Sequence, residues 1–533
     1  MALTLEQAVG QQFLLSFTGK REVPAELRAV FARQHVGGIV LFRARNMGTL
    51  EELRALTAAL QQAAATAGQP PLVIAADQEG GQLMAIGQAT PFPGNMALGA
   101  ARSEKLAWRV GRAIGCELAA TGVNVDFAPV CDVNNNPKNP VVGTRSFGED
   151  PKLVGTLAAA MVRGLQAAGV AATAKHFPGH GDTATDSHHG LAVLPHDMRR
   201  ARRIELPPFQ SAIAAGARLV MTAHVAFPAL NGGSLAPATV SPALLDGLLR
   251  RKLGFEGIVV TDAMDMKAME QGPGYVADAM AAIAAGADLL LFNHHLERVE
   301  PAWAAIVQAA RRGLLSGDRI QASARRVLAL KKWLQNREQP PLDVVCSPEH
   351  QALAEEVAQR SITLVRDSTH LLPLRLPAEA RVAVVTPRPQ DLTPADTSSY
   401  LKPELAAAVR RHHACVHEFT IPMNPRPDEV RALCDTIAGY NLAIVGTINA
   451  ADAAGQAALV NALLKRQIET IAVAMRLPYD LAAFPAAPAY VCTYSILPPS
   501  MQAAADALWG KSAFPGQLPV TRWGMLSRTP KVQ

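Results

Sequence analysis

The segment 175–190, KHFPGHGDTATDSHHG, is the densest group of side chains in this sequence that can take part in chemistry. It holds four histidines, two aspartates and a lysine, and its glycines and proline favour a loop. The histidines can cap backbone groups of a purely structural loop, or His and Asp can bind a metal such as zinc. Alternatively, a carboxylate can orient an imidazole that titrates near neutrality and serves as general acid and base. All three interpretations are open at this point.

The elements that must position this loop are short apolar runs that alternate with helical patterns. Seven such runs are clear, at 37–42, 72–77, 123–130, 171–177, 217–225, 257–262 and 287–292. Near-continuous apolar runs are typical of parallel strands that are covered on both faces. Between them lie helical patterns such as 151–169, which has apolar residues at four-residue intervals. Repeated strand–helix units of this number predict a (β/α)8 TIM-like barrel, although an eighth strand is not evident.

Polar side chains lie at or just beyond the C-terminal ends of five of these runs. They are Asp77, Lys175, His176, His224, Asp262 and Asn293. In a barrel, sites are built on this face because the loops that follow the strands open there. We therefore expect these side chains to share one site.

A second α/β region is predicted after the barrel. The chain has 533 residues, which is too many for one hydrophobic core. Residues 297–336 have a helical pattern, and Pro340-Pro341 marks a boundary. A helix at 349–361 and strand-like runs at 381–386, 442–447, 470–475 and 490–494 indicate a small parallel sheet with helices. We expect a catalytic barrel at 1–336, a linker at 337–348 and an α/β sandwich domain at 349–533.

The composition excludes several classes of protein. The chain is 49% hydrophobic and 18% charged, as in an ordinary globular protein. The net charge of +6 is spread along the chain without a basic run of five residues, so we expect no nucleic-acid and no membrane partner. The six cysteines form no CxxC motif and are expected to be free thiols.

The N-terminal segment 1–17, MALTLEQAVGQQFLLSF, lacks the basic region and the small-residue cleavage site of a signal peptide. We interpret it as an amphipathic helix that begins with a capping box formed by Thr4 and Gln7. No apolar stretch reaches the length of roughly 18 residues that a membrane-spanning helix needs. A cytoplasmic location is therefore expected.

The loop motif resembles glycoside hydrolase family 3, and specifically its β-N-acetylglucosaminidase branch. That branch carries the pattern KHFPGHGDTxxDSH, which this sequence matches at every specified position. Further similar segments follow in the family's order: 77–81 (DQEGG), 92–100 (FPGNMALGA), 139–148 (NPVVGTRSFG), 221–230 (MTAHVAFPAL), 254–266 (GFEGIVVTDAMDM), 361–374 (SITLVRDSTHLLPL) and 518–521 (LPVT). The resemblance implies a barrel followed by an α/β sandwich.

The resemblance also implies roles for individual residues. Asp262 matches the family nucleophile, at the end of the sixth of the runs above, and His188 matches the acid/base on a mobile loop. Asp186 is the carboxylate that polarises His188, and their spacing of two can place both side chains on one side of an extended loop. The residues that match those holding the non-reducing sugar are Asp77, Arg145, Lys175 and His176. His224 is a further candidate for lining the substrate pocket, whereas Glu79 is interpreted as structural.

The expected activity is that of a retaining, exo-acting β-N-acetylglucosaminidase that uses no cofactor and no metal. The expected partner is a carbohydrate, either a muropeptide or a chitooligosaccharide, in the recycling of cell-wall fragments. One alternative is a phosphorylase with the same site, and another is a catalytically silent sugar-binding protein. The sequence departs from the family pattern DQEGGxVxR at Ala85, where the family has an arginine that contacts the substrate. This departure leaves the choice of sugar open.

Overall fold

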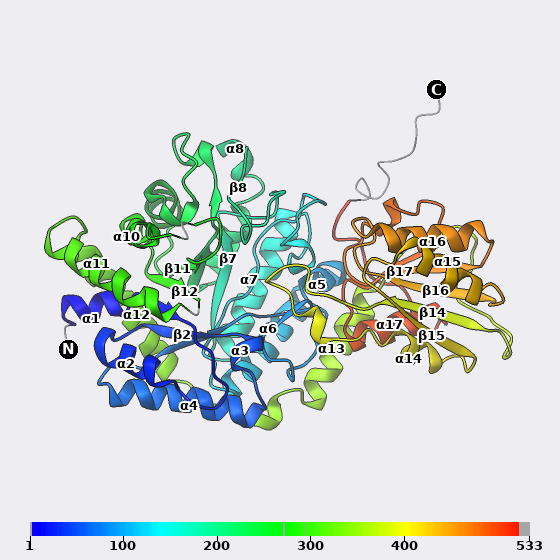
Figure 1. Ribbon diagram of the computed structural model, residues 1–533, viewed down its shortest axis with the longest axis horizontal. Helices are drawn as coiled ribbons and strands as arrows, with labels where there is room; N and C mark the ends of the chain where they lie inside the picture. Colours follow the sequence, from blue (N-terminus) through cyan, green and yellow to red (C-terminus); the bar gives the residue numbers. More distant parts are fainter. Residues whose placement is uncertain (1–2, 270–271, 294, 522–533) are drawn as a thin grey trace.

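The computed structural model describes residues 3–269, 272–293 and 295–521. Eight strands close a barrel, in the order β1-β12-β11-β9-β7-β6-β3-β2, and every neighbouring pair is parallel (Figure 1). The barrel strands are β1 (Phe13–Leu15), β2 (Gly38–Leu41), β3 (Val73–Ala76), β6 (Val125–Asp126), β7 (Ala171–Phe177), β9 (Leu219–Thr222), β11 (Ile258–Ala263) and β12 (Leu289–Phe292). The predicted TIM-like barrel is confirmed, and all seven predicted runs contribute a strand.

The strand that the sequence did not reveal is β1, which lies inside the segment predicted as one N-terminal helix. That prediction was wrong in its second half. Helix α1 (Leu5–Gly10) does begin with the Thr4–Gln7 capping box, but it ends at Gly10. A side chain at Gly10 would lie 1.5 Å from the carbonyl oxygen of Gln34, so the chain needs glycine where it passes this neighbour. The next residues pair with β12 and β2 and complete the barrel.

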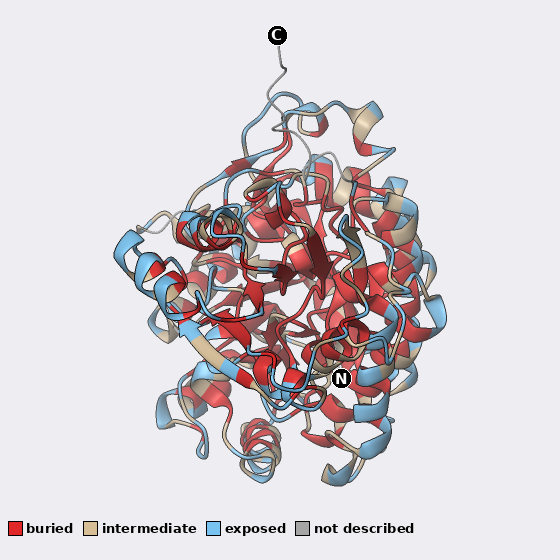
Figure 2. Cartoon of the chain, turned by 90° about the vertical axis from the view of Figure 1, so that its right-hand side faces the viewer, coloured by how far each residue is buried: buried red, intermediate tan, exposed pale blue. Residues whose placement is uncertain are grey.

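Helices surround the barrel, and buried residues are concentrated in its interior (Figure 2). The main helices of this part are α2 (Ala25–Gln34), α3 (Arg43–Asn46), α4 (Leu50–Thr66), α5 (Asn95–Ala101), α6 (Glu104–Ala120), α7 (Pro151–Ala167), α8 (Met198–Ala201), α9 (Pro207–Ala214), a π-helix (Ala243–Lys252), α10 (Tyr275–Ala285), α11 (Val299–Arg311) and α12 (Gly317–Gln335). The helix predicted at 151–169 is α7, and the helical region predicted at 297–336 is the pair α11 and α12. The pair is interrupted because Gly313 takes a left-handed φ of 73° and Ser316 caps a new helix.

The C-terminal part is a six-stranded sheet in the order β13-β18-β17-β16-β14-β15, with helices packed on it. Its strands are β13 (Thr363–Asp367), β14 (Val382–Pro387), β15 (Val416–Ile421), β16 (Leu442–Thr447), β17 (Thr470–Ala474) and β18 (Ala489–Cys492), and its helices are α13 (Pro348–Ser361), α14 (Leu405–Arg410), α15 (Pro427–Thr436), α16 (Ala454–Lys465) and α17 (Pro498–Leu508). The expected parallel sheet is mixed, because β13 runs antiparallel to β18.

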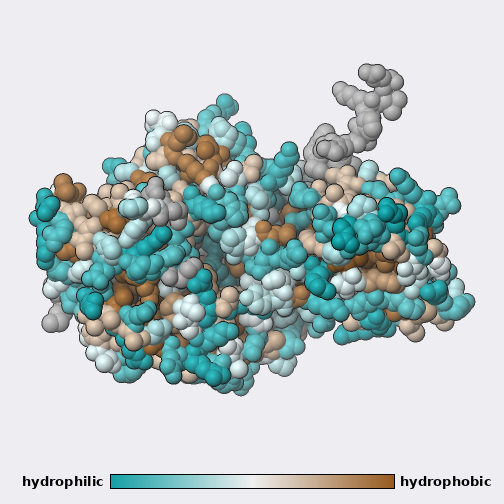
Figure 3. Space-filling model, in the orientation of Figure 1, coloured by the Kyte–Doolittle hydropathy of each residue, from teal (hydrophilic) through white to brown (hydrophobic). Residues whose placement is uncertain are grey.

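The outer surface is mostly hydrophilic in the view of Figure 3, with scattered hydrophobic residues. None of the helices in the described ranges is long and apolar enough to cross a membrane.

Candidate active site

A cavity of about 370 Å³ opens at the C-terminal ends of the barrel strands. Seven of the residues predicted from the sequence line it: Asp77, Arg145, Lys175, His176, His188, Asp262 and Asn293. They come from four strand ends and from the loops after β6 and β7. Asp186 and His224 do not line the cavity but contact its walls from behind. The structure therefore brings the predicted group together in one place.

Asp262 lies within β11, close to its C-terminal end. Because β1 is a barrel strand, β11 is the seventh strand along the chain, and not the sixth that the resemblance suggested. One carboxylate oxygen, Oδ1, accepts a hydrogen bond from the backbone N–H of Ala263 at 2.8 Å. Burial opposes the charge of this carboxylate, but nearby His176, His224 and His188 outweigh it and lower the pKa of Asp262. The group is ionised near neutrality and can act as a nucleophile.

His188 and Asp186 form the pair that the sequence predicted. Nδ1 of His188 lies 2.7 Å from Oδ1 of Asp186, and the backbone N–H of His188 donates to the same oxygen at 2.9 Å. The residues form a turn and not the extended loop that we expected, and this double contact is what holds them together. Burial raises the pKa of Asp186, but the bonds from His188 outweigh it and lower the pKa. An ionised carboxylate only accepts, so Nδ1 carries the proton and Nε2 is the nitrogen available to a substrate.

The side chains of His180 and Asn139 hold the loop that carries His188 in place. His180 lies 2.7 Å from the hydroxyl of Thr183 and 3.0 Å from that of Ser187, which precedes His188. The side-chain amide of Asn139 donates to the carbonyl oxygens of His180 at 2.8 Å and of Gly181 at 3.1 Å. His180 is therefore a structural residue of the loop, and its ring nitrogens are both engaged.

Four charged side chains form a buried network at one side of the cavity. Lys175 Nζ lies 2.6 Å from Asp77 and 2.7 Å from Glu79. Arg145 donates twice to Glu79, from Nε at 2.9 Å and from Nη2 at 2.7 Å, and once to the carbonyl of Val141. Burial raises the pKa of Glu79, but Arg145 and Lys175 outweigh it and lower the pKa to about 2. Glu79 thus fixes both cations, which agrees with the structural role expected for it.

His176 is held by Asp132, a residue that the sequence reasoning missed. Nδ1 of His176 lies 2.7 Å from Oδ2 of Asp132, and Oδ1 accepts the backbone N–H groups of His176 and His180. Burial and the neighbouring cations Arg145 and Lys175 hold the pKa of His176 well below its usual value. A signal was present, because Asp132 follows the strand-like run 123–130 just as the other site residues follow theirs.

His224 was predicted to line the substrate pocket, but the structure places it behind the wall. It is fully buried, and its ring nitrogens contact the hydroxyl of Thr239 at 2.7 Å and the carbonyl oxygen of Ala263 at 2.9 Å. Ala263 follows Asp262 directly. The geometry thus assigns His224 to the support of the backbone beside Asp262 and leaves it no free ring nitrogen for a sugar.

A segment of the C-terminal part, residues 391–400, completes the cavity, which the sequence did not reveal. Gln82 is the centre of the contact: its carbonyl oxygen accepts from the backbone N–H of Thr397 at 2.8 Å, and its side chain accepts from Arg476 at 2.8 Å. Arg476 also forms a buried ion pair with Asp396 at 2.6 Å. The two parts of the chain therefore build the site jointly.

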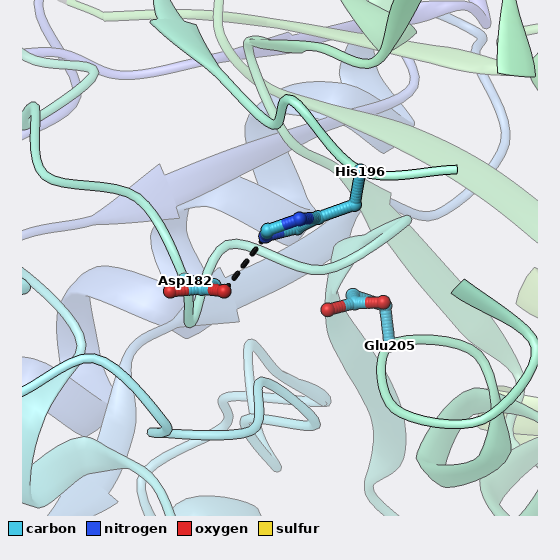
Figure 4. A group of neighbouring side chains, drawn as sticks. All are labelled: Asp182, His196 and Glu205. Atoms are coloured by element: carbon cyan, nitrogen blue, oxygen red, sulfur yellow. Dashed lines mark hydrogen bonds and ion pairs between the residues drawn. The ribbon is translucent and has the colours of Figure 1, made fainter. Parts of the chain in front are cut away.

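One group of possible metal ligands occurs in the part of the chain that the structure describes. Asp182, which belongs to the loop 175–190, lies together with His196 and Glu205, and His196 Nε2 is 2.7 Å from Asp182 (Figure 4). Arg200 contacts Asp182 and lies 3.3 Å from Glu205. Its guanidinium already supplies a positive charge to both carboxylates, which favours an ion-pair cluster over a metal site.

A carboxylate, an imidazole oriented by a second carboxylate and a wall of polar groups lie together on the C-terminal rim of a barrel. These are groups that the chemistry of a glycosidase can use. Residues 4–330 match the family model described as the Glycosyl hydrolase family 3 N terminal domain. This chain belongs to glycoside hydrolase family 3 and is a glycoside hydrolase.

Individual relatives agree with this assignment. The β-hexosaminidase A of Pseudoalteromonas piscicida is 36% identical over 70% of this chain and 69% of its own. The solved structure of a family 3 β-N-acetylglucosaminidase from Paenibacillus sp. str. FPU-7 is 40% identical, has a TM-score of 0.92 and covers 98% of this chain and 99% of that chain. A structure of a β-glucoside phosphorylase is 25% identical with a TM-score of 0.84, and covers 98% of this chain and 95% of that chain.

Proposed function

We propose that this protein is a retaining, exo-acting β-N-acetylglucosaminidase that removes terminal β-linked N-acetylglucosamine. The observation that carries the proposal is the pair of Asp186 and His188 at the cavity that Asp262 lines. The similarity to a β-N-acetylglucosaminidase along nearly the whole chain supports the choice of sugar.

In the first half of the reaction, the Asp262 carboxylate attacks the anomeric carbon of the terminal sugar. The glycosidic bond breaks, and its electron pair stays with the leaving oxygen. That oxygen takes the proton from Nε2 of His188. Asp186 stabilises the imidazolium that precedes this transfer, since it faces the opposite nitrogen at 2.7 Å.

In the second half, His188 is neutral and acts as the base. It takes a proton from water as the water oxygen attacks the anomeric carbon, and the bond to Asp262 breaks. The free sugar leaves with its original anomeric configuration. Lys175, Asp77 and His176 form the polar wall that holds the sugar during both halves.

The substrate class is part of the same proposal. We infer that the sugar is cleaved from muropeptides or chitooligosaccharides, and that the protein recycles cell-wall fragments in the cytoplasm. Hydrolysis of disaccharide-peptide fragments compared with chitobiose, together with fractionation of the native cells, tests both points.

Phosphorolysis is a second candidate, favoured by two observations. The chain is similar over nearly its whole length to a β-glucoside phosphorylase. A carboxylate base repels an approaching phosphate by roughly 4 kcal/mol, for unit charges at 4 Å and an effective dielectric near 20. A neutral imidazole base avoids this repulsion. One observation argues against phosphorolysis. Lys175 and Arg145 are already paired with Asp77 and Glu79, which removes the attraction that these cations would offer an anion.

The deciding experiment is the turnover of p-nitrophenyl N-acetyl-β-glucosaminide with and without millimolar phosphate, with analysis of the sugar product. We expect free N-acetylglucosamine in both cases, and slower turnover of the corresponding glucoside and galactosaminide. Formation of N-acetylglucosamine 1-phosphate would instead establish the phosphorylase. Binding without turnover would contradict catalysis altogether.

A further inference from the structure

Arg43, an arginine that follows a different strand, lines the same cavity as Ala85. Arg43 begins α3, two residues after β2, and β2 is the barrel neighbour of β3, which Asp77 follows. Arg43, Asp77 and Ala85 line the same cavity. The backbone N–H of Ala85 donates to the carbonyl oxygen of Asp77 at 3.1 Å, so these two residues are in direct contact.

The guanidinium of Arg43 lies against the backbone of residues 84–87. Its Nη1 donates to the carbonyl oxygen of Met84 at 3.4 Å, which is long for a hydrogen bond. A side-chain carbon added at Gly87 would lie only 2.5 Å from Nη2. The methyl group of Ala85 is short, and the charged group beside it is supplied by Arg43.

Two contacts fix this guanidinium without using up its donors. The ring of Tyr400, from the C-terminal part, lies 4.4 Å from the guanidinium carbon, a cation–π distance. Asp391 is a nearby negative charge that attracts the guanidinium. Within residues 3–269, 272–293 and 295–521, the bond to Met84 is the one hydrogen bond of this guanidinium, which has five N–H donors.

Arg145 and Lys175, two of the three other Lys and Arg residues that line the cavity, are occupied in a way that Arg43 is not. Arg145 uses three nitrogens on Glu79 and Val141, and Lys175 contacts two carboxylates. A half-buried guanidinium with unused donors fits acceptors on a bound molecule, and sugar hydroxyl oxygens are such acceptors.

We propose that Arg43 is a substrate-binding residue whose guanidinium donates to hydroxyl groups of the terminal sugar, on the side of the cavity where Asp77 lies. β2 is three strands from both β7 and β11 in the barrel order, whose C-terminal ends bear the acid/base loop and Asp262. Arg43 thus binds the part of the sugar that is remote from the anomeric carbon. This proposal rests on the proposed function, since it names a contact to that same substrate.

The test compares Arg43→Ala and Arg43→Lys with the wild type. The substrates are an aryl N-acetyl-β-glucosaminide and its deoxy analogues, each of which lacks the 3-, 4- or 6-hydroxyl group. A hydrogen bond to a charged group is worth roughly 1.5–3 kcal/mol, so Arg43→Ala is expected to lower kcat/KM about 10- to 100-fold, mainly through KM. Arg43→Lys, which keeps the charge but not the fork, falls in between. Arg33 is an exposed arginine that does not line the cavity, so Arg33→Ala serves as the control and retains wild-type kinetics.

The deoxy substrates separate binding from a structural role. If Arg43 binds one hydroxyl group, removing that hydroxyl from the substrate lowers the activity of the wild type. The same removal hardly changes the already reduced activity of Arg43→Ala, and this insensitivity is expected for that hydroxyl only. An equal additional loss on all deoxy substrates, or kcat/KM of Arg43→Ala within twofold of wild type, would overturn the proposal. Inactivity of the wild type on every glycoside tested would instead refute the proposed function.

Discussion

Among single residues, His188 has the role that is easiest to isolate, because it acts first as the acid and then as the base of the proposed reaction. We expect His188→Ala to lower turnover of natural substrates by about 10²–10⁴-fold, because their leaving oxygen needs a proton. A dinitrophenyl leaving group departs without one, so its first half-reaction should be far less affected. His189→Ala, a change at the exposed neighbouring histidine, is the matched control. Equal losses on both kinds of substrate would show that His188 does something else.

The sequence predicted those site residues whose chemistry is visible in a motif at a strand end or in the loop that follows it. Asp262, His188 and Lys175 belong to this group. It missed contacts that depend on distant parts of the chain, such as Asp132 against His176 or Tyr400 against Arg43. It also took His224 for a lining residue, because a position at a strand end does not reveal whether both ring nitrogens are already bonded.

At the scale of elements, the loop that carries His188 is tied to the following segment by Asp182, His196, Arg200 and Glu205. Since Arg200 balances the carboxylates, we expect prolonged treatment with a chelator to leave activity unchanged. Hydrolysis of the aryl glycoside before and after chelation, with a parallel metal analysis, is the measurement. Loss of activity that zinc restores would establish a metal site and contradict this view.

Elements with strong apolar runs were predictable, whereas short ones were not. The strand β1 has three residues and directly follows a short helix, so the apolar pattern of the helix hid it. The strand β13 is half exposed and pairs antiparallel at the sheet edge, and neither its exposure nor its direction follows from a local pattern. Pairing across distant segments decided both.

At the scale of the whole molecule, Lys331 links the last barrel helix to the N-terminal segment, since its Nζ donates to the side chain of Gln11 at 2.6 Å. Burial lowers the pKa of Lys331 to about 7. The unfolded chain binds this proton below pH about 10.5, but the folded protein does so only below about 7. The free energy of unfolding therefore decreases as the pH falls from about 10.5 to about 7, and Lys331 causes no further change below that pH.

Lys331→Met is expected to raise the free energy of unfolding at pH 7. Removal of the buried charge contributes on the order of 4 kcal/mol, and leaving the side chain of Gln11 unpaired takes back about 1–3 kcal/mol. It should also flatten the pH dependence of the melting temperature between pH 7 and 10. Lys332→Met, at the exposed neighbour, is the control and should change neither quantity. A variant with the wild-type pH profile would contradict the buried neutral amine.

If Asp262 is the nucleophile of a retaining β-N-acetylglucosaminidase, the covalent intermediate on its carboxylate can be trapped. Incubation with a 5-fluoro N-acetyl-β-glucosaminyl fluoride slows the second half-reaction, so the sugar stays bound to the protein. Peptide mapping by mass spectrometry then locates the adduct. We expect one sugar per chain on Asp262 and none in Asp262→Ala; an adduct on Glu79 or Asp265 would contradict the assignment of Asp262.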